Sequence, residues 1–338
     1  MTNILLIYTG GTIGMIKNPL TGELESFNFK HIHDHVPELG RLNVHIESIS
    51  FEEPIDSSEM NLGHWKNMAE LVRDHYDKYD GFVILHGSDT MAFSASALSF
   101  MLQGLKKPVV FTGSQLPIGT IRTDGKENLI TAIEIAGMQD EDGHPILQEV
   151  AVYFEYSLYR GNRSSKISAN QFEAFQSPNY PELAKAGVQI EWQKDRLYRS
   201  SLGKLEVFTE FSNELALIRL FPGINFDVYE SIFTNSQVKA IVLETYGSGN
   251  APSDAKFQAF ITHFIQRGGV VLNITQCGSG AVQQGAYQTS SFFEKVGVVS
   301  GRNLTSEAAI TKLMYLLGQT STATLTQKLQ ESLVGEMD

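Results

Sequence analysis

The chain has 338 residues, of which 42% are hydrophobic and 19% are charged, as expected for a folded protein with an ordinary hydrophobic core. At roughly 150 residues per domain, this length predicts two domains. The net charge of −12 and the lack of any block of Lys and Arg exclude a nucleic-acid-binding surface. Cys277 is the only cysteine, which excludes intrachain disulfides and cysteine-based metal sites.

The chain begins with a short apolar run, Ile4–Tyr8, which stops at Thr9-Gly10-Gly11 and therefore predicts a strand. The basic region and small-residue cleavage pattern of a signal peptide are missing. No apolar stretch approaches the roughly 20 residues that a membrane-spanning helix needs. We therefore expect a cytoplasmic protein that has no membrane partner.

Short apolar runs alternate with helical patterns through the first half of the chain. Runs rich in β-branched or aromatic residues predict buried parallel strands at Ile4–Tyr8, Phe82–His86, Pro108–Thr112 and Val150–Phe154, and Val44–Ser50 is predicted as a further strand. Between them, Leu62–Tyr79 and Thr90–Leu105 have the three- and four-residue apolar spacing of helices, and Asp89 is placed to cap the second. This alternation predicts an α/β domain over residues 1–190, with a mostly parallel sheet and flanking helices.

The second half repeats the alternation after a polar interruption. Residues 191–213 have no sustained period and predict a linker between domains, although a pair of strands within this segment is also compatible with the pattern. Strands are then predicted at Ala216–Phe221, Ala240–Glu244 and Val270–Thr275, and helices at Asp227–Ser236, Ser253–Arg267 and Thr305–Leu317. Residues 214–338 are therefore expected to form a smaller C-terminal α/β domain.

The first candidate functional residue is Thr12, which lies in Thr9-Gly10-Gly11-Thr12-Ile13-Gly14 directly after a predicted strand. Glycines at this position allow a tight turn and a close approach of the backbone to a ligand. A dinucleotide-binding loop fits poorly, because the spacing of its glycines is not present. A plain turn is the simpler alternative, but it gives no reason for a hydroxyl between glycines, where a base could make it a nucleophile.

A second hydroxyl lies at another strand-to-helix turn, His86-Gly87-Ser88-Asp89-Thr90-Met91. The free N–H groups at the start of the following helix favour negative charge beside Ser88 and Asp89. Simple helix capping explains Asp89 equally well. We expect His86 to be a hydrogen-bonded histidine at the end of its strand.

Three other segments carry polar groups with less specific patterns. Asp56-Ser57-Ser58-Glu59-Met60 precedes a predicted helix and is interpreted as its capping segment. The donors of Tyr159–Lys166 fit either a surface loop or a lysine placed against Asp89, and spacing alone leaves both open. His31, His33 and His35 fit a solvated helix better than a metal site, because no second spaced pair of ligands accompanies them. No metal is therefore expected.

The two turns together resemble the two signatures of the bacterial-type L-asparaginases, and the resemblance extends over nearly the whole chain. Two motifs with the expected wide separation are a strong signal, whereas either alone would be modest. Further segments resemble the cytoplasmic, type I branch of that family: Asp80–Leu85, Tyr159–Arg163, Tyr246–Pro252 and Thr275–Cys277.

The resemblance implies an amidohydrolase that converts L-asparagine to L-aspartate and ammonia without a metal or cofactor. Thr12 matches the nucleophile that forms an acyl-enzyme with the side-chain carbonyl. Ser88, Asp89 and Lys166 match a second group in which a hydroxyl, a carboxylate and an ammonium are linked. In that group Lys166 would keep Asp89 ionised and accept a proton passed from a hydroxyl or water.

The resemblance also implies how the substrate is held. Asp89 would contact the α-ammonium, and backbone N–H groups at the two turns, including that of Gly11, would receive the oxyanion. The remaining residues that match the substrate-binding segment are Asp56, Ser57 and Ser58. Asn250, in a glycine-rich turn, would complete the pocket of a neighbouring subunit, because family members assemble as dimers of dimers. We therefore expect a homodimer or homotetramer.

The chain departs from the family pattern at three places. Ser88 stands where the family usually has threonine, which removes the methyl group that restricts the hydroxyl. No tyrosine lies between Tyr8 and Tyr76, although many relatives carry one on the mobile loop after the nucleophile. The substitutes considered for its role are Glu23, Glu25 and, from a neighbouring subunit, Tyr287.

The third departure concerns a regulatory site for a second asparagine, which some type I enzymes possess. Ser165, Thr275 and Cys277 fit that site, but Glu244 stands where those enzymes have an arginine and would not attract a carboxylate.

Two rival functions are compatible with parts of this pattern. A related amidase could act on glutamine or serve as an amidotransferase subunit, but such a subunit usually has an extra amino-terminal domain, and Thr12 lies near the start of this chain. An inactive α/β protein could instead bind an amino acid as a sensor. The presence of Thr12, Asp89 and Lys166 together favours the enzyme.

Overall fold

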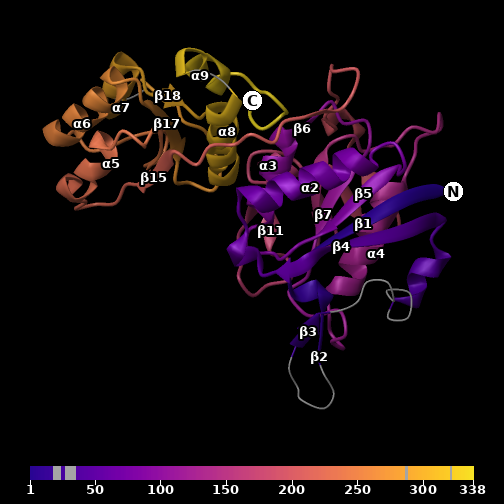
Figure 1. Cartoon of the computed structure of the whole chain (residues 1–338). Helices are drawn as coiled ribbons and strands as arrows, with labels where there is room; N and C mark the ends of the chain where they lie inside the picture. The colour runs from indigo at the N-terminus through magenta and orange to yellow at the C-terminus, as the bar shows by residue number, and fades with distance from the viewer. Residues whose placement is uncertain (18–23, 27–35, 286–287, 320–321) are drawn as a thin grey trace. The chain divides into compact units, whose positions relative to one another are not determined.

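The computed structural model describes residues 1–17, 24–26, 36–285, 288–319 and 322–338. It divides into two units, Met1–Thr209 and Glu210–Asp338, each described by itself (Figure 1). Each unit contains its own sheet and its own hydrophobic core. The expected α/β fold class is confirmed.

The first unit is built around an eight-stranded sheet in the order β13-β12-β9-β8-β7-β5-β1-β4. The five strands from β8 to β4 are mutually parallel, whereas β9, β12 and β13 join by antiparallel pairing. The strands are β1 (Thr2–Gly10), β4 (Val44–Ile55), β5 (Gly81–Leu85), β7 (Val109–Thr112), β8 (Val150–Phe154), β9 (Ser157–Arg160), β12 (Ala184–Ala186) and β13 (Ile190–Trp192). The apolar runs of β1, β5, β7 and β8 are buried, as parallel strands with covered faces require, whereas the edge strand β4 is mostly half-buried or exposed.

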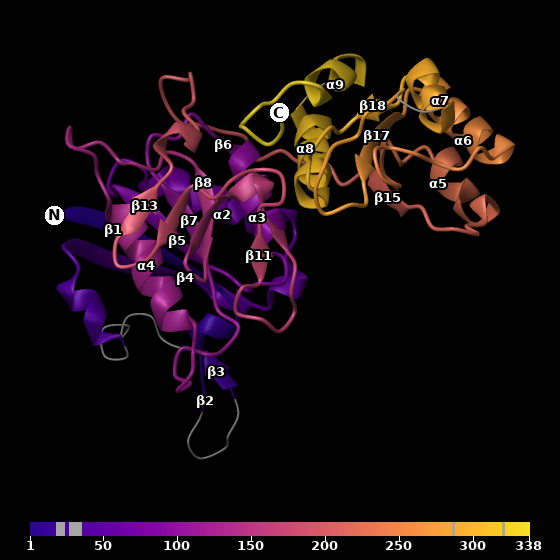
Figure 2. The same ribbon diagram turned by 180° about the vertical axis from the view of Figure 1, so that it is seen from behind.

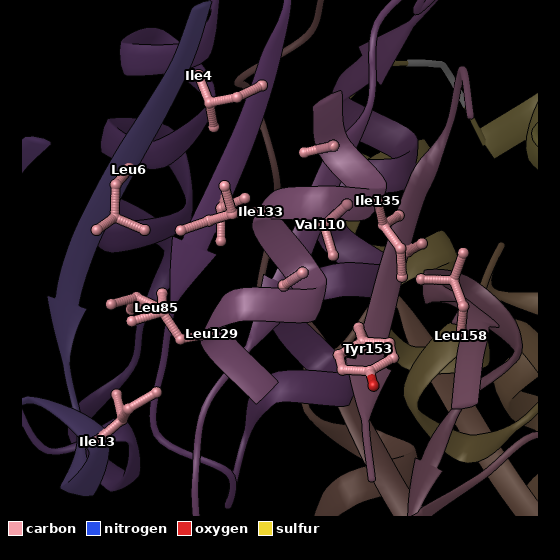
Figure 3. Packing of buried hydrophobic residues seen from close by; sticks show 14 of the residues in the cluster. Ile4, Leu6, Ile13, Leu85, Val110, Leu129, Ile133, Ile135, Tyr153 and Leu158 are labelled. Atoms are coloured by element: carbon pink, nitrogen blue, oxygen red, sulfur yellow. The ribbon is translucent and has the colours of Figure 1, made fainter. Parts of the chain in front are cut away.

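Helices cover both faces of this sheet. Helices α2 (Leu62–His75) and α3 (Met91–Met101) lie on one face, and α4 (Gly125–Gly137) lies on the other (Figures 1 and 2). Because side chains alternate along a strand, every second residue of β1, β5, β7 and β8 faces α4. Figure 3 shows Leu129 and Ile133 of α4 among Leu6, Leu85 and other buried side chains of these strands.

Short pairs of strands complete the first unit. Strands β2 (Met15–Lys17) and β3 (Leu24–Ser26) pair, as do β10 (Ser165–Lys166) and β11 (Phe175–Gln176), and β6 (Leu102–Gln103) and β14 (Glu206–Val207). Single 3-10 turns occur at η1 (Thr12–Gly14), η3 (Pro37–Arg41), η4 (Ser57–Glu59), η5 (Gly161–Arg163) and η6 (Lys194–Arg196). The turns η1, η4 and η5 lie in segments that carry candidate site residues.

The second unit has a four-stranded parallel sheet in the order β15-β16-β17-β18. Its strands are β15 (Leu215–Arg219), β16 (Ala240–Thr245), β17 (Val270–Thr275) and β18 (Val299–Ser300). The turn η7 (Phe226–Tyr229) and helices α5 (Glu230–Thr234), α6 (Ala255–Gln266) and α7 (Gln288–Val296) lie on one side of this sheet, and α8 (Ser306–Gln319) and α9 (Thr322–Leu329) on the other (Figure 1). Stacked phenylalanines, including Phe226 on Phe257, fill the core beneath α5 and α6.

The last residues of the chain are fastened to α8. The ammonium of Lys312 lies 2.6 Å from a carboxylate oxygen of Glu336, and both side chains are fully buried. Glu336 also accepts hydrogen bonds from the backbone N–H groups of Leu333 and Val334. Met337 is buried as well, so the C-terminal segment belongs to the core of the second unit.

Some elements differ from those expected. The second helix ends at Met101 rather than Leu105, because Leu102 and Gln103 pair with β14 as strand β6. The polar segment predicted to link the domains contains part of β13 and all of η6 and β14, and these two strands pair with β12 and β6 rather than with each other. Within the described residues, no helix is long and apolar enough to span a bilayer.

Candidate active site

Three turns meet at the carboxyl edge of the large sheet. Thr12 follows β1, Ser57 follows β4 and Ser88 follows β5, and these three strands are neighbours in the order β5-β1-β4. The carboxyl ends of parallel strands face the same side of a sheet, which is where ligands of open α/β folds bind. The topology therefore gathers hydroxyl groups from three distant stretches of sequence.

The turn that carries Thr12 requires glycine at the two positions before Thr12. Gly10 has φ +133° and Gly11 has φ +86°, values that other residues rarely adopt. A side chain at Gly10 would overlap the backbone of Ile55, its neighbour in β4. After Thr12 the chain makes the turn η1, in which Gly14 leaves room for the ring of Tyr8. The backbone around Thr12 is thus fixed from both sides.

The three turns touch through atoms that leave no room for further side chains. A Cβ atom at Gly11 would lie 2.5 Å from the Cα atom of Gly87, and one at Gly87 would lie 2.5 Å from Oγ of Ser57. Ser57 is itself buried, and its carbonyl accepts a hydrogen bond from Thr90 Oγ1 at 2.7 Å. The glycines therefore bring the Thr12 and Ser88 turns into backbone contact.

Lys166 links the second hydroxyl to a carboxylate. Its Nζ donates to Ser88 Oγ at 2.8 Å and to Asp89 Oδ1 at 2.6 Å. The lysine side chain is 16% exposed, whereas that of Asp89 is 66% exposed and can face a ligand. A hydroxyl, a carboxylate and an ammonium are therefore joined in one network.

The segment before Lys166 is not the surface loop that its charged residues suggested. Residues 160–164 are all buried, and Arg160 pairs with Glu149 at 2.7 Å while its guanidinium stacks on Tyr180. This packing and the β10–β11 hairpin place Lys166 against Asp89. Of the two interpretations left open by the sequence, the surface loop is wrong.

Asp89 does not cap the helix that follows it, so that prediction is wrong. The residue at the N-cap of α3 is Thr90, and no side chain caps the helix. The carboxylate of Asp89 is instead engaged by Lys166, which is 77 residues away and carries the charge that a backbone N–H lacks.

Asp56, Ser57 and Ser58 form the third turn. Asp56 accepts hydrogen bonds from the backbone N–H and the hydroxyl of Ser58, both at 2.9 Å. These bonds lower the pKa of Asp56. Asp56 caps η4 rather than α2, whose N-cap is Asn61. The capping interpretation therefore applies to the short turn and not to the helix.

His86 is a buried histidine at the end of its strand, as expected. Its Nδ1 lies 2.6 Å from the carbonyl oxygen of Gly87, and its Nε2 lies 2.8 Å from Ser94 Oγ. Complete burial lowers the pKa of His86 to about 4, so the ring is neutral at pH 7. Through its contact with Gly87, this buried ring helps to hold the Ser88 turn in place.

Sequence reasoning missed Gln115, which reaches the same network. Gln115 follows β7, and its Oε1 lies 3.5 Å from Ser88 Oγ. Asp124, which is buried, accepts the backbone N–H of Gln115 at 2.8 Å. A signal was present, because the strand Pro108–Thr112 was predicted and its carboxyl end had to meet the same edge as its neighbours.

The other site residues considered from the sequence lie elsewhere. Asn250 closes a turn with Tyr246 in the second unit, where Gly247 and Gly249 have positive φ. Glu244 is buried beside Arg219, whose Nη1 lies 3.2 Å away. Thr275 accepts the N–H of Cys277, which is exposed, whereas Ser165 belongs to the first unit. These residues are therefore described within their own units.

Several expected residues fall outside the described part. The histidines 31, 33 and 35, together with Glu23 and Tyr287, lie there, and the side chain of Glu25 is not described. Among the described residues, the potential ligand atoms of Asp140, Asp142 and His144 lie within 4.8 Å of one another. All three are exposed, and Asp140 already accepts the backbone N–H groups of the other two, as in a simple turn.

Both units of the chain match families of known proteins. Residues 3–198 match the family described as "Asparaginase, N-terminal", and residues 214–329 match the "Glutaminase/Asparaginase C-terminal domain". L-asparaginase 1 of Escherichia coli (strain K12) is 41% identical over 341 residues, which cover 99% of this chain and 98% of that protein. The 60 kDa lysophospholipase of Mus musculus is 36% identical, with 99% of this chain and 62% of that protein covered. The crystal structure of L-asparaginase I from Vibrio cholerae matches with a TM-score of 0.90 at 38% identity, covering 100% of this chain and 99% of that one.

Proposed function

The chain belongs to the asparaginase family of hydrolases, and on that basis we propose that it converts L-asparagine to L-aspartate and ammonia with Thr12 as the nucleophile. The observation that carries the proposal is the network of Ser88, Asp89 and Lys166 beside the Thr12 turn. It supplies the proton-transfer groups that amide hydrolysis needs.

In the first half of the reaction, the Thr12 hydroxyl attacks the carbonyl carbon of the side-chain amide. Its proton is lost as the C–O bond forms, and the amide nitrogen takes up a proton and leaves as ammonia. Backbone N–H groups at the Gly11 and Ser88 turns stabilise the oxyanion, each contributing about 3–4 kcal/mol in comparable hydrolases. The product of this half is an ester between Thr12 and aspartate.

In the second half, water attacks the ester carbonyl and frees Thr12. Lys166 in its neutral form accepts a proton through the Ser88 hydroxyl, and the Thr12 oxygen regains one as the C–O bond breaks. The two hydrogen bonds of Lys166 support this role, because they align the amine with the hydroxyl and neutralise the new positive charge against Asp89.

Substrate binding is proposed to use the two flanking turns. Asp89 is exposed at the site and would pair with the α-ammonium of asparagine through a charge-assisted hydrogen bond. Residues 56–58 would bind the α-amino and α-carboxylate groups, with the exposed carboxylate of Asp56 available to the ammonium. No metal or other cofactor is required by this chemistry.

We further propose a homodimer or homotetramer located in the cytoplasm. The resemblance to type I enzymes supports both points, and Asn250 of a neighbouring subunit would then complete the pocket. Sedimentation equilibrium of the wild-type protein tests the assembly, and loss of turnover on Asn250→Ala tests the residue. The hypothesis of a regulatory site at Ser165, Glu244, Thr275 and Cys277 is tested by the saturation curve, which should be sigmoidal if a second asparagine activates the enzyme.

The decisive experiment is ammonia release from L-asparagine by the purified protein, with Thr12→Ala as the control. We expect steady turnover in the wild type and none above background in the variant. Binding of asparagine without ammonia release would identify an amino-acid sensor instead. Faster turnover of L-glutamine would identify a glutaminase, since one methylene of pocket depth is worth only about 1–3 kcal/mol.

A further inference from the structure

We infer that Gln115 is a positioning residue that orients the Ser88 hydroxyl and secures the hairpin that carries Lys166. This inference rests on the proposed function of the Ser88–Lys166 network. Gln115 is half-buried at the carboxyl edge of β7, beside the Ser88 turn. It joins three parts of the chain that are separate in sequence: the Ser88 turn, the β10–β11 hairpin and the start of α4.

The orientation of the Gln115 amide follows from its partners. Its Nε2 donates to the carbonyl oxygen of Gln171 at 3.0 Å, and a carbonyl can only accept a hydrogen bond. The amide oxygen must therefore face the opposite way, toward Ser88 Oγ at 3.5 Å. Gln115 can only accept at this atom, so the Ser88 hydroxyl is the donor.

The partners of the Ser88 hydroxyl are then assigned for the state in which Lys166 carries its proton, before neutral Lys166 serves as the acceptor. It accepts a hydrogen bond from Lys166 Nζ at 2.8 Å and donates its single proton toward Gln115. The second bond is long, as catalytic hydrogen bonds often are before a substrate closes the site. Together the two partners select one rotamer of a side chain that lacks the β-methyl group of threonine.

The backbone of Gln115 is held independently of its side chain. The carboxylate of Asp124 accepts the N–H groups of Gln115 at 2.8 Å and of Leu116 at 3.1 Å. Asp124 is 5% exposed and precedes α4, so the anchor is rigid. A substitution of the Gln115 side chain should therefore leave this turn in place.

The other end of the amide holds the segment after Lys166. Gln171 lies between β10 and β11, five residues beyond Lys166 in the same hairpin. That segment is exposed at Gln171, so the bond from Gln115 restrains a part of the chain that solvent would otherwise surround. Gln115 thereby acts on both partners of the hydrogen bond between Ser88 and Lys166.

The test compares Gln115→Met, which keeps the length but removes both hydrogen-bonding groups, in the wild type and in Ser88→Thr. We expect kcat to fall about three- to tenfold in the Ser88 background, the range for one lost hydrogen bond, with KM changed less than about twofold. In the Ser88→Thr background the methyl group restricts the hydroxyl, so the fall should be below about twofold. Equal falls in both backgrounds would overturn the inference.

Gln148→Met is the matched control, because Gln148 lies near the amino end of β8, and its side chain donates to Pro145. It should change neither kcat nor KM.

Two readouts do not depend on turnover. Amide hydrogen exchange over residues 167–174 should be faster in Gln115→Met and unchanged in Gln148→Met, because only the first loses the Gln171 contact. A crystal structure of Gln115→Met should show Ser88 in more than one rotamer. Unchanged exchange together with a single rotamer would refute the positioning role. A wild type without ammonia release would instead refute the proposed function while leaving these two readouts interpretable.

Discussion

Lys312 and Glu336 form an ion pair at 2.6 Å in which neither side chain is exposed to solvent at all. Burial lowers the pKa of Lys312, and the attraction of Glu336 opposes that shift. The pair joins the last residues of the chain to α8. Removing one partner leaves the other charge buried and uncompensated, which is costly in protein interiors.

We therefore expect Lys312→Met to lower the free energy of unfolding of the second unit by about 3–5 kcal/mol, measured by urea denaturation. The double variant Lys312→Met/Glu336→Gln should recover part of that loss. Lys256→Met removes an exposed partner of Asp227 and should have no measurable effect. A midpoint for Lys312→Met equal to that of the wild type would contradict the expectation.

Replacing Lys166 should affect turnover far more than folding. Lys166→Met removes the amine that contacts Ser88 and Asp89, and general acid–base groups typically contribute about 10²–10⁴-fold to a rate. Ammonia release should fall by that order, with a thermal midpoint close to the wild type. Lys185→Met, at the exposed position of strand β12, is the control. Wild-type turnover in Lys166→Met would remove this lysine from the mechanism.

Because the turns are in contact, even a methyl group at residue 87 should strongly affect stability and activity. A methyl group at residue 87 would lie 2.5 Å from Ser57 Oγ and 2.7 Å from its Cβ, and Ser57 is buried. Gly87→Ala should lower stability by about 1–3 kcal/mol and displace the Ser88 turn enough to reduce kcat. Gly203→Ala is the comparison, because a Cβ there meets nothing within 4 Å. Equal activity in the two variants would show that the turns can separate freely.

His86 makes stability depend on pH in the acid range. Its pKa is lowered to about 4 in the folded protein from 6.5, so between these values the unfolded chain binds more protons. Stability contributed by neutral His86 is therefore complete above pH 6.5 and is lost as the pH falls toward 4, by up to about 3 kcal/mol. In His86→Gln this pH-dependent part should vanish from urea unfolding measured between pH 4 and 7. Parallel pH profiles for wild type and variant would be inconsistent with a buried neutral ring.

Glu155 makes stability depend on pH in the opposite direction to His86. Burial, with repulsion from Asp124, Glu127 and Glu173, raises its pKa to about 7 from 4.5, so the folded protein binds more protons between these values. Its ionisation therefore lowers stability as the pH rises from 4.5 through 7.

Glu155→Gln should accordingly raise the thermal midpoint at pH 8 and leave it nearly unchanged at pH 5. The exposed Glu191 gives the control, since Glu191→Gln should be neutral at both pH values. A Glu155→Gln variant that is less stable than the wild type at pH 8 would speak against the repulsion.

The parallel strands and the helices α2 and α3 were predictable because their apolar periodicity is local. Helix α4 was not predicted, although its buried Leu129 and Ile133 complete the main core, because it begins and ends at glycine and has no side-chain cap. The antiparallel strand β9 was not predicted, and for the residues from its end to Lys166 a surface loop was one of two interpretations left open. Its Arg160 suggests solvent, and the buried partner that reverses this, Glu149, is recognisable only in three dimensions.

The candidate site was predictable as a set of turns but not as a network. Thr12 and Ser88 stand out because glycines surround them at strand ends. The pairing of Lys166 with Asp89 was left open, since 77 residues separate them and helix capping explained the carboxylate equally well. Gln115 was missed because a single glutamine after a strand carries no local pattern. Its role depends on partners at residues 88 and 171.

The contact of Gly11 with Gly87 determines how the distance between the Thr12 and Ser88 turns is maintained. Thr12 and Ser88 continue from β1 and β5, which are hydrogen-bonded neighbours in the sheet. Neighbouring strands lie about 4.8 Å apart, a spacing fixed by backbone hydrogen bonds. With no side chain between the two turns, that spacing sets how closely the backbones at Gly11 and Gly87 approach each other. The sheet therefore fixes the separation of the two turns that carry the hydroxyl groups. This separation should change only when β1 and β5 themselves move apart.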